Sequence, residues 1–123
     1  MARLLVVEDD ADVRGTLTAA LTFDGHDVIS ASNGLEAQQA VDNLEYDVVV
    51  TDLIMADMDG IQLVRQVRSR TPRTAIIAIA GGGRGNTQEY LKLARLIGAA
   101  ATLEKPFELS AFRTTLASVL EKH

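Results

Sequence analysis

The sequence contains no cysteine, which excludes disulfide bonds, a thiol nucleophile and a zinc–thiolate cluster. Basic residues are also scarce: 12 lysines and arginines stand against 17 aspartates and glutamates, for a net charge of -5. A nucleic-acid-binding face would need a basic surplus, so we expect no nucleic acid partner for this chain. There is no apolar run long enough to cross a membrane, and Met1–Asp10 lacks the length and cleavage site of a signal peptide. We therefore expect a soluble, cytoplasmic protein with no membrane partner.

Repeats, low-complexity tracts and linker-like stretches are absent as well. The chain has 123 residues, enough to bury a hydrophobic core without disulfides or a structural metal. We therefore predict a single domain that spans residues 1–123.

Short apolar runs, rich in valine, isoleucine and alanine, alternate with stretches of helical periodicity. Runs that are apolar at every position suit strands that are covered on both faces. Alternation of such strands with helices is typical of an α/β fold, in which a doubly wound parallel sheet carries helices on both sides. The five predicted strands are Arg3–Val7, Asp27–Ala31, Val48–Thr51 ended by Asp52, Ala75–Ala80, and Ala101–Glu104.

Helices are predicted between the strands from apolar spacing and from residues that favour helix starts. The first covers Ala11–Phe23, and the second and fourth are expected to turn Leu44 and Leu93 toward the core. Acceptor side chains at the expected spacing open three helices, at Asn33 with Glu36, Asp59 with Gln62, and Asn86 with Glu89. Gly81–Gly85 is expected to be a flexible switch loop. It is not a P-loop, because it lacks the Gly-Lys-Ser/Thr ending and does not follow the first strand.

Charged residues gather where the predicted strands end. Glu8, Asp9 and Asp10 follow the first strand, Asp52 ends the third and Lys105 ends the fifth. Ligands of such sheets bind beyond the carboxyl ends of the strands, so these side chains are expected to share one rim. Converging carboxylates favour a cation among them, and oxygen ligands favour Mg²⁺. Carboxylates, metal and lysine together indicate phosphoryl transfer with Asp52 as a covalent nucleophile. For Asp10 and Asp12 the alternative is a solvated, acidic helix start.

These residues resemble the receiver domain of two-component response regulators over essentially the whole chain. The resemblance lies in Glu8-Asp9, in Asp52–Met55 followed by Asp59-Gly60, and in Lys105-Pro106-Phe107. It implies a flavodoxin-like sheet with strand order 2-1-3-4-5. It also implies that Asp52 accepts a phosphoryl group from a sensor histidine kinase or a histidine phosphotransfer protein.

The resemblance further assigns a role to each residue at the rim. Asp9 would bind Mg²⁺ directly and Glu8 through water, with Asp52 and the backbone carbonyl of Ile54 as the remaining protein ligands. Lys105 would hold the phosphoryl oxygens, next to a cis Lys105–Pro106 peptide bond. The fourth helix, fifth strand and fifth helix would form the face that signals to a downstream protein partner.

Three positions depart from the family pattern. The usual threonine or serine at the end of the fourth strand is Ala80, the usual aromatic residue on the fifth strand is Thr102, and the common proline after Met55 is Ala56. We therefore expect a phosphorylation-controlled switch and not a conventional enzyme, with a phosphorylation-independent binding module of the same fold as the alternative. An aspartyl-phosphate hydrolase is a third possibility, but it would need a second aspartate as acid/base at the position of Ile54.

Overall fold

The protein is a five-stranded parallel sheet flanked by helices, seen in a computed structural model that describes residues 1–81 and 86–122. Each strand pairs in parallel with its neighbours, in the order β2-β1-β3-β4-β5. This confirms the predicted strand order 2-1-3-4-5. The strands are β1 (Arg3–Val7), β2 (Asp27–Ala31), β3 (Val48–Asp52), β4 (Ala75–Gly81) and β5 (Ala101–Lys105).

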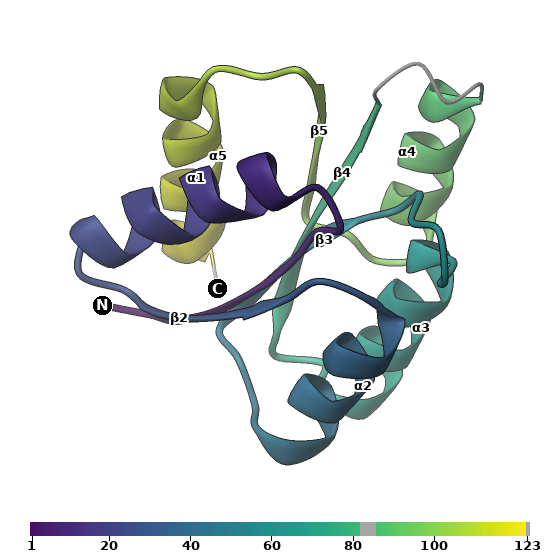
Figure 1. Cartoon of the computed structure of the whole chain (residues 1–123). Helices are drawn as coiled ribbons and strands as arrows, with labels where there is room; N and C mark the ends of the chain where they lie inside the picture. The colour runs from purple at the N-terminus through teal and green to yellow at the C-terminus, as the bar shows by residue number, and fades with distance from the viewer. Residues whose placement is uncertain (82–85, 123) are drawn as a thin grey trace.

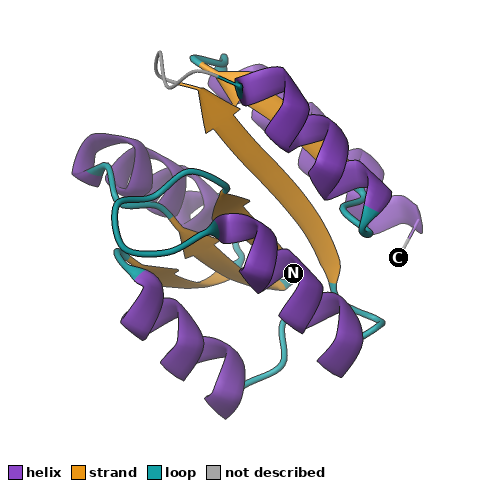
Figure 2. Ribbon diagram, turned by 90° about the vertical axis from the view of Figure 1, so that its right-hand side faces the viewer, coloured by secondary structure: helices purple, strands orange, loops and turns teal. Residues whose placement is uncertain are grey.

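Five helices connect the strands and cover both faces of the sheet. Figure 1 shows α1 and α5 on one side of the strands and α2, α3 and α4 on the other, and Figure 2 shows the sheet between these two layers. This arrangement explains why the central strands carry unbroken apolar runs, since neither face of the sheet meets water there. The helices are α1 (Ala11–Phe23), α2 (Gly34–Asn43), α3 (Gly60–Arg70), α4 (Thr87–Leu96) and α5 (Leu109–Lys122).

Alternate residues of the central strands β1, β3 and β4 pack into two separate hydrophobic cores. On β3, Val49 faces α2, α3 and α4, whereas Val48 and Val50 face α1 and α5. The strands β3 and β4 are buried over their whole length. The centre of the sheet is therefore rigidly packed, and polar side chains at its carboxyl end are held by a firm scaffold.

The predicted helix starts are confirmed at Asn33 and Asp59, where the side chains accept the amide N–H groups of Glu36 and Ile61. At Asn86 the helix begins as predicted, but the Asn86 side chain makes no capping hydrogen bond, so that part of the prediction is wrong. None of the helices among the described residues combines the length and apolar character that a membrane-spanning segment needs.

Two leucines and one glycine lie elsewhere than predicted. Leu44 is 40% exposed because α2 ends before it, and Leu93 is 38% exposed on the outer side of α4. Gly81 is the last residue of β4 and not the first residue of a loop, because it pairs with Lys105 of β5. The rest of the predicted switch loop, residues 82–85, lies outside the described residues.

Candidate functional site

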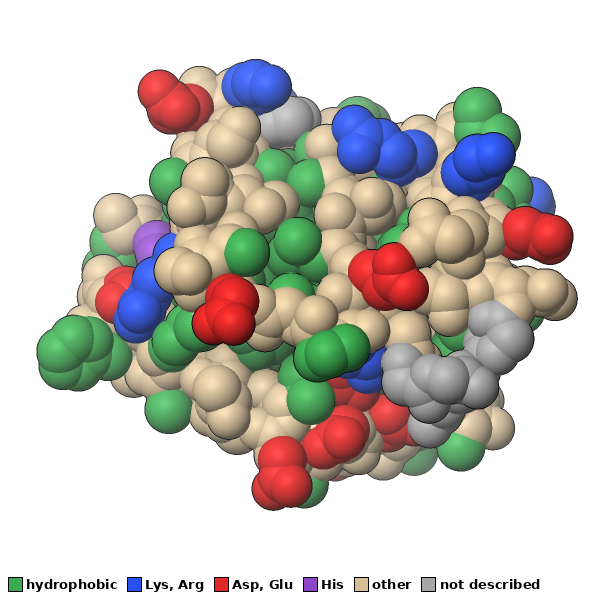
Figure 3. Space-filling model, turned by 90° about the horizontal axis from the view of Figure 1, so that it is seen from above, with side chains coloured by type: hydrophobic (Ala, Val, Ile, Leu, Met, Phe, Trp, Pro, Cys, Tyr) green, Lys and Arg blue, Asp and Glu red, His purple; other side chains and the backbone are tan. Residues whose placement is uncertain are grey.

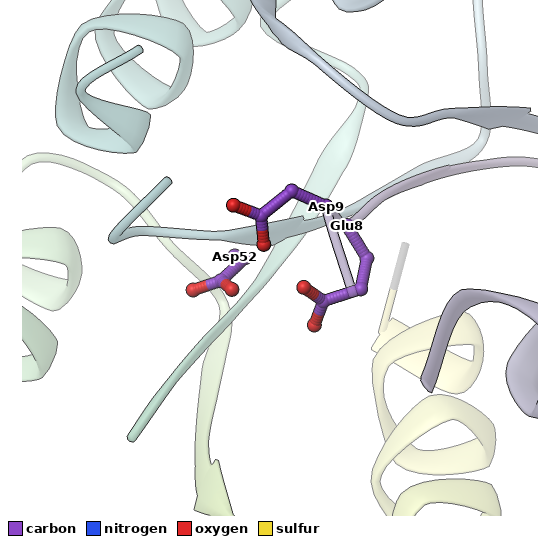
Figure 4. A group of neighbouring side chains, drawn as sticks. All are labelled: Glu8, Asp9 and Asp52. Carbon is purple, nitrogen blue, oxygen red and sulfur yellow. The ribbon is translucent and has the colours of Figure 1, made fainter. Parts of the chain in front are cut away.

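Three carboxylates converge at the carboxyl end of the sheet. Strands β1 and β3 are parallel neighbours with Val7 opposite Thr51, so the residues that follow them emerge side by side. Glu8, Asp9 and Asp52 each place a carboxylate oxygen within 4.8 Å of the others. Figure 4 shows the three side chains turning their carboxylates toward a common space. The sequence prediction that these residues share one rim is therefore confirmed as geometry.

Lys105 joins this cluster from β5, two strands away from Asp52. Its Nζ atom lies 2.9 Å from Asp52 Oδ2 and 2.9 Å from Glu8 Oε1. The backbone of Lys105 lies directly against Gly81 at the end of β4, where a side chain would not fit. A Cβ atom on Gly81 would lie 2.6 Å from the Lys105 carbonyl oxygen. The Lys105–Pro106 peptide bond is cis, as the resemblance implies.

Backbone amides orient the three carboxylates. The Asp10 amide donates to Glu8 Oε2 at 3.1 Å, and the Ile54 amide donates to Asp52 Oδ1 at 3.1 Å. The Ala56 amide donates to Asp9 Oδ2 at 3.3 Å. Each carboxylate therefore accepts a backbone amide, and Glu8 and Asp52 also accept Lys105, which fixes their directions before any ligand arrives.

The loop after β3 can lie this close to the site because Gly60 has no side chain. A Cβ atom there would sit 2.4 Å from the carbonyl oxygen of Asp52 and 2.5 Å from Leu53 Cα. Both of these are backbone atoms of the strand end, so they cannot move aside. The Asp59-Gly60 pair is thus explained by packing: Asp59 caps α3, and Gly60 lets the helix start against the end of β3.

The cluster carries more negative charge than Lys105 can balance. Glu8 and Asp52 are buried, and on the face seen from above acidic side chains gather at one edge beside a partly hidden basic one (Figure 3). Burial raises the pKa of Glu8 to about 7, against the hydrogen bonds from Lys105 and Asp10 that lower it. Burial would lower the pKa of Lys105, but its hydrogen bonds to Asp52 and Glu8 outweigh this, and the net pKa is raised. The site thus holds a charged lysine and favours one further positive charge, a proton or a metal cation.

The donor set fits a hard divalent cation. Among the described residues, the possible metal ligands that converge here are carboxylate oxygens, and the backbone lies close by at Ile54 and Ala56. Carboxylate and carbonyl oxygens with water are what Mg²⁺ and Ca²⁺ take. The described residues around the cluster include no histidine, the ligand that a zinc site would favour.

Metal binding at this cluster is expected to weaken as the pH falls below 7. Glu8 is an acid whose pKa in the folded protein is raised to about 7, so at lower pH it holds a proton that the cation must displace. One unit below that pKa, the apparent Mg²⁺ affinity should be about tenfold lower than one unit above it. Titration calorimetry at the two pH values measures this. Equal affinities, or the same pH dependence in Glu8→Gln, would contradict the role of Glu8.

Asp10 does not belong to the cluster. Its side chain accepts the amides of Asp12 and Val13 and so caps α1. This is the helix-start alternative considered for Asp10, and it explains why an acidic residue follows Asp9 here. The sequence patterns did not indicate two further contacts: the Arg14 guanidinium donates to the Glu8 carbonyl at 2.9 Å, and Asp57 accepts the amide of Gly34. Helix periodicity predicts neither contact, because each one joins a loop to a helix.

Comparison with known proteins gives a consistent result. Residues 4–117 match the family model described as the response regulator receiver domain. The chain is 35% identical to the Sensor kinase CckA of Brucella abortus (strain 2308) over 123 residues, covering 98% of this chain and 13% of that protein. It is also 35% identical to the Response regulator MprA of Mycobacterium sp. (strain KMS) over 121 residues, covering 98% of this chain and 51% of that protein.

Among solved structures, a response regulator receiver domain protein from Clostridium thermocellum superposes with a TM-score of 0.88 at 27% identity. The match covers 99% of this chain and 96% of that one. The chain spans about half the length, or less, of the curated relatives above. What those longer proteins do as a whole is therefore not transferred to this chain.

Proposed function

Since this chain belongs to the receiver domain family of response regulators, we propose that it is a phosphorylation-controlled switch that accepts a phosphoryl group on Asp52. Residues 1–123 would form one receiver domain. The observation that carries the proposal is the placement of the Lys105 ammonium 2.9 Å from a buried Asp52 carboxylate, within a three-carboxylate cluster. An aspartate in this setting can attack phosphorus only if positive charge surrounds the incoming phosphoryl group.

In this proposal Asp9 holds Mg²⁺ directly and Glu8 holds it through water, with Asp52 and the Ile54 carbonyl as further ligands. The bound cation would supply charge neutralisation at the phosphoryl oxygens. The chain's own residues prepare for this: amides of Asp10, Ile54 and Ala56 fix the directions of the three carboxylates. The excess negative charge of the cluster supports the assignment, because it is relieved when a cation binds.

Asp52 would act as the nucleophile. One of its carboxylate oxygens forms a bond to phosphorus while the bond from phosphorus to the donor breaks, and the donor group keeps that electron pair. The donor would be a phosphohistidine of a sensor histidine kinase or a histidine phosphotransfer protein, whose imidazole nitrogen then takes up a proton. Lys105 would hold a phosphoryl oxygen in place of its present contact with Asp52 Oδ2.

The output would be a change in protein binding and not substrate turnover. We propose that the surface of α4, β5 and α5 contacts a downstream protein partner, and that neither nucleic acid nor membrane is bound by this domain. Leu93 and Leu96 of α4 are exposed on this surface, at 38% and 84%. The domain itself would be cytoplasmic.

A binding module that does not depend on phosphorylation is the second candidate, and Ala80 is what favours it. Ala80 is fully buried at the end of β4, opposite Glu104, and has no hydroxyl to offer a phosphoryl group. Thr102, opposite Ala78, is a small residue where the resemblance leads one to expect an aromatic side chain. The two candidates differ in whether Asp52 can be phosphorylated at all.

Intact-protein mass spectrometry separates them. After incubation with acetyl phosphate and Mg²⁺, the wild type should gain one phosphoryl group, with acetate as the leaving group. Asp52→Asn should gain none, and neither should the wild type in EDTA. If Asp52→Asn, or the wild type in EDTA, is phosphorylated as much as the wild type in Mg²⁺, the proposal is wrong.

A further inference from the structure

The loop between β3 and α3 is attached to the start of α2 by one side chain. Both carboxylate oxygens of Asp57 accept the amide N–H of Gly34, at 3.1 Å and 2.9 Å. Gly34 is the first residue of α2, where the helix leaves amide groups without partners inside the helix. A carboxylate is favoured at this end by the helix dipole as well as by the hydrogen bonds.

The packing around Gly34 is adapted to this contact. A Cβ atom on Gly34 would lie 2.8 Å from Met58 Cβ and 3.3 Å from Asp57 Oδ2. Only glycine lets residues 57 and 58 approach the helix so closely. Asn33 caps a different amide, that of Glu36, with its own side chain, so Asp57 is a second acceptor at this helix end. The Asp57 contact also fixes the position of the loop, because Asp57 belongs to the loop.

That loop contains Ile54, whose backbone carbonyl is a proposed metal ligand. Its near end is tied to the carboxylates, since the Ile54 amide donates to Asp52 and the Ala56 amide to Asp9. The next residue, Asp57, ties the middle of the loop to α2, and the far end at Asp59 forms a β-bridge with Ile54. An alanine at position 56 leaves the backbone dihedral φ free where a proline ring would fix it, so the stiffness of the loop must come from its contacts.

We propose that Asp57 is a positioning residue for the metal site: its contact with Gly34 holds residues 54–56 where they face the carboxylate cluster. The inference rests on the proposed function, because it concerns how the same site is prepared for Mg²⁺. The Asp57 carboxylate remains bound to the Gly34 amide of α2 and does not bind the metal. Losing the contact lets the loop move, and Mg²⁺ must then bind and order it at the same time, which lowers the affinity.

The test compares Asp57→Ala and Asp57→Asn with a matched control, Glu36→Gln. Glu36 is a second carboxylate at the same end of α2, but within the described part of the chain its side chain accepts hydrogen bonds from Ser32 and not from the loop. Glu36→Gln therefore reports the loss of charge alone. Titration with MgCl₂, followed by amide chemical shifts, should show that Asp57→Ala needs about fivefold more Mg²⁺ than Glu36→Gln. Asparagine keeps an oxygen that can accept the Gly34 amide, so Asp57→Asn should stay close to Glu36→Gln.

Two further readouts separate positioning from a loss of fold. Hydrogen exchange at the Gly34 amide, measured without Mg²⁺, should be faster in Asp57→Ala than in Glu36→Gln. At saturating Mg²⁺ the phosphorylation rate of Asp57→Ala should return to that of the wild type. If the wild type binds Mg²⁺ but Asp57→Ala matches Glu36→Gln, the role of Asp57 is refuted and the proposed function stands. If the wild type binds no Mg²⁺, both are refuted.

Discussion

Substituting Lys105 with methionine is expected to slow phosphorylation of Asp52 about a hundredfold at saturating Mg²⁺. Among the described residues, Lys105 is the one whose ammonium lies within hydrogen-bonding distance of both Glu8 and Asp52, at 2.9 Å from each. Without it, part of the charge that develops on the phosphoryl oxygens has no partner. Methionine keeps much of the aliphatic side chain, so the packing beside Gly81 changes little. The rate is measured from the phosphorylated fraction in intact-protein mass spectra over time.

Lys92→Met serves as the control for this experiment. Lys92 is exposed on α4, so its substitution removes the same charge from the protein without touching the site. The control should phosphorylate as fast as the wild type. Circular dichroism of both variants verifies that they are folded. A rate for Lys105→Met close to that of the control would show that the lysine does not stabilise phosphoryl transfer.

Restoring a hydroxyl at position 80 is expected to make the response to phosphorylation more complete. The family resemblance implies that a hydroxyl at this strand end moves to the phosphoryl group. A hydrogen bond to a charged group is worth about 1.5–3 kcal/mol, which is about a ten- to hundredfold shift in a two-state equilibrium. Ala80 is fully buried and cannot donate this bond. Ala80→Thr should therefore enlarge the amide chemical-shift changes that phosphorylation causes in α4 and β5.

Ala80→Val is the matched control, because valine has nearly the shape of threonine and lacks the hydroxyl. Any effect of crowding in the buried site appears in both variants, whereas the hydrogen bond appears in threonine alone. If threonine and valine give the same shifts as the wild type, another group already performs this function and the account of Ala80 is wrong.

The architecture could be predicted because it is encoded locally. The runs around Leu4, Val49 and Ile77 are apolar on both faces. A short strand of this composition is stable only in a sheet that is covered on both sides. The acidic and basic side chains at the strand ends followed from the same reasoning, because parallel strands carry their carboxyl ends to one rim. Glu8, Asp9, Asp52 and Lys105 were all found this way.

Contacts that depend on loops could not be predicted in the same manner. Asp57 and Gly34 are 23 residues apart, and nothing in either segment indicates the other. Arg68 is a similar case: it donates to the backbone carbonyls of Thr71, Thr74 and Gly98, so a residue that looks like part of an exposed helix end holds three segments together. Helix periodicity also misplaced Leu93, because α4 lies at the edge of the sheet and one of its sides stays in solvent.

The central claim is that Asp52 itself carries the phosphoryl group, and locating the group tests it most directly. An acyl phosphate is reduced by borohydride to the alcohol, so a phosphorylated aspartate becomes homoserine. After phosphorylation with acetyl phosphate and Mg²⁺, followed by reduction and proteolysis, tandem mass spectrometry should find homoserine at position 52. Homoserine at Asp9, Asp57 or Asp59 instead of position 52, or at no aspartate, would contradict the account.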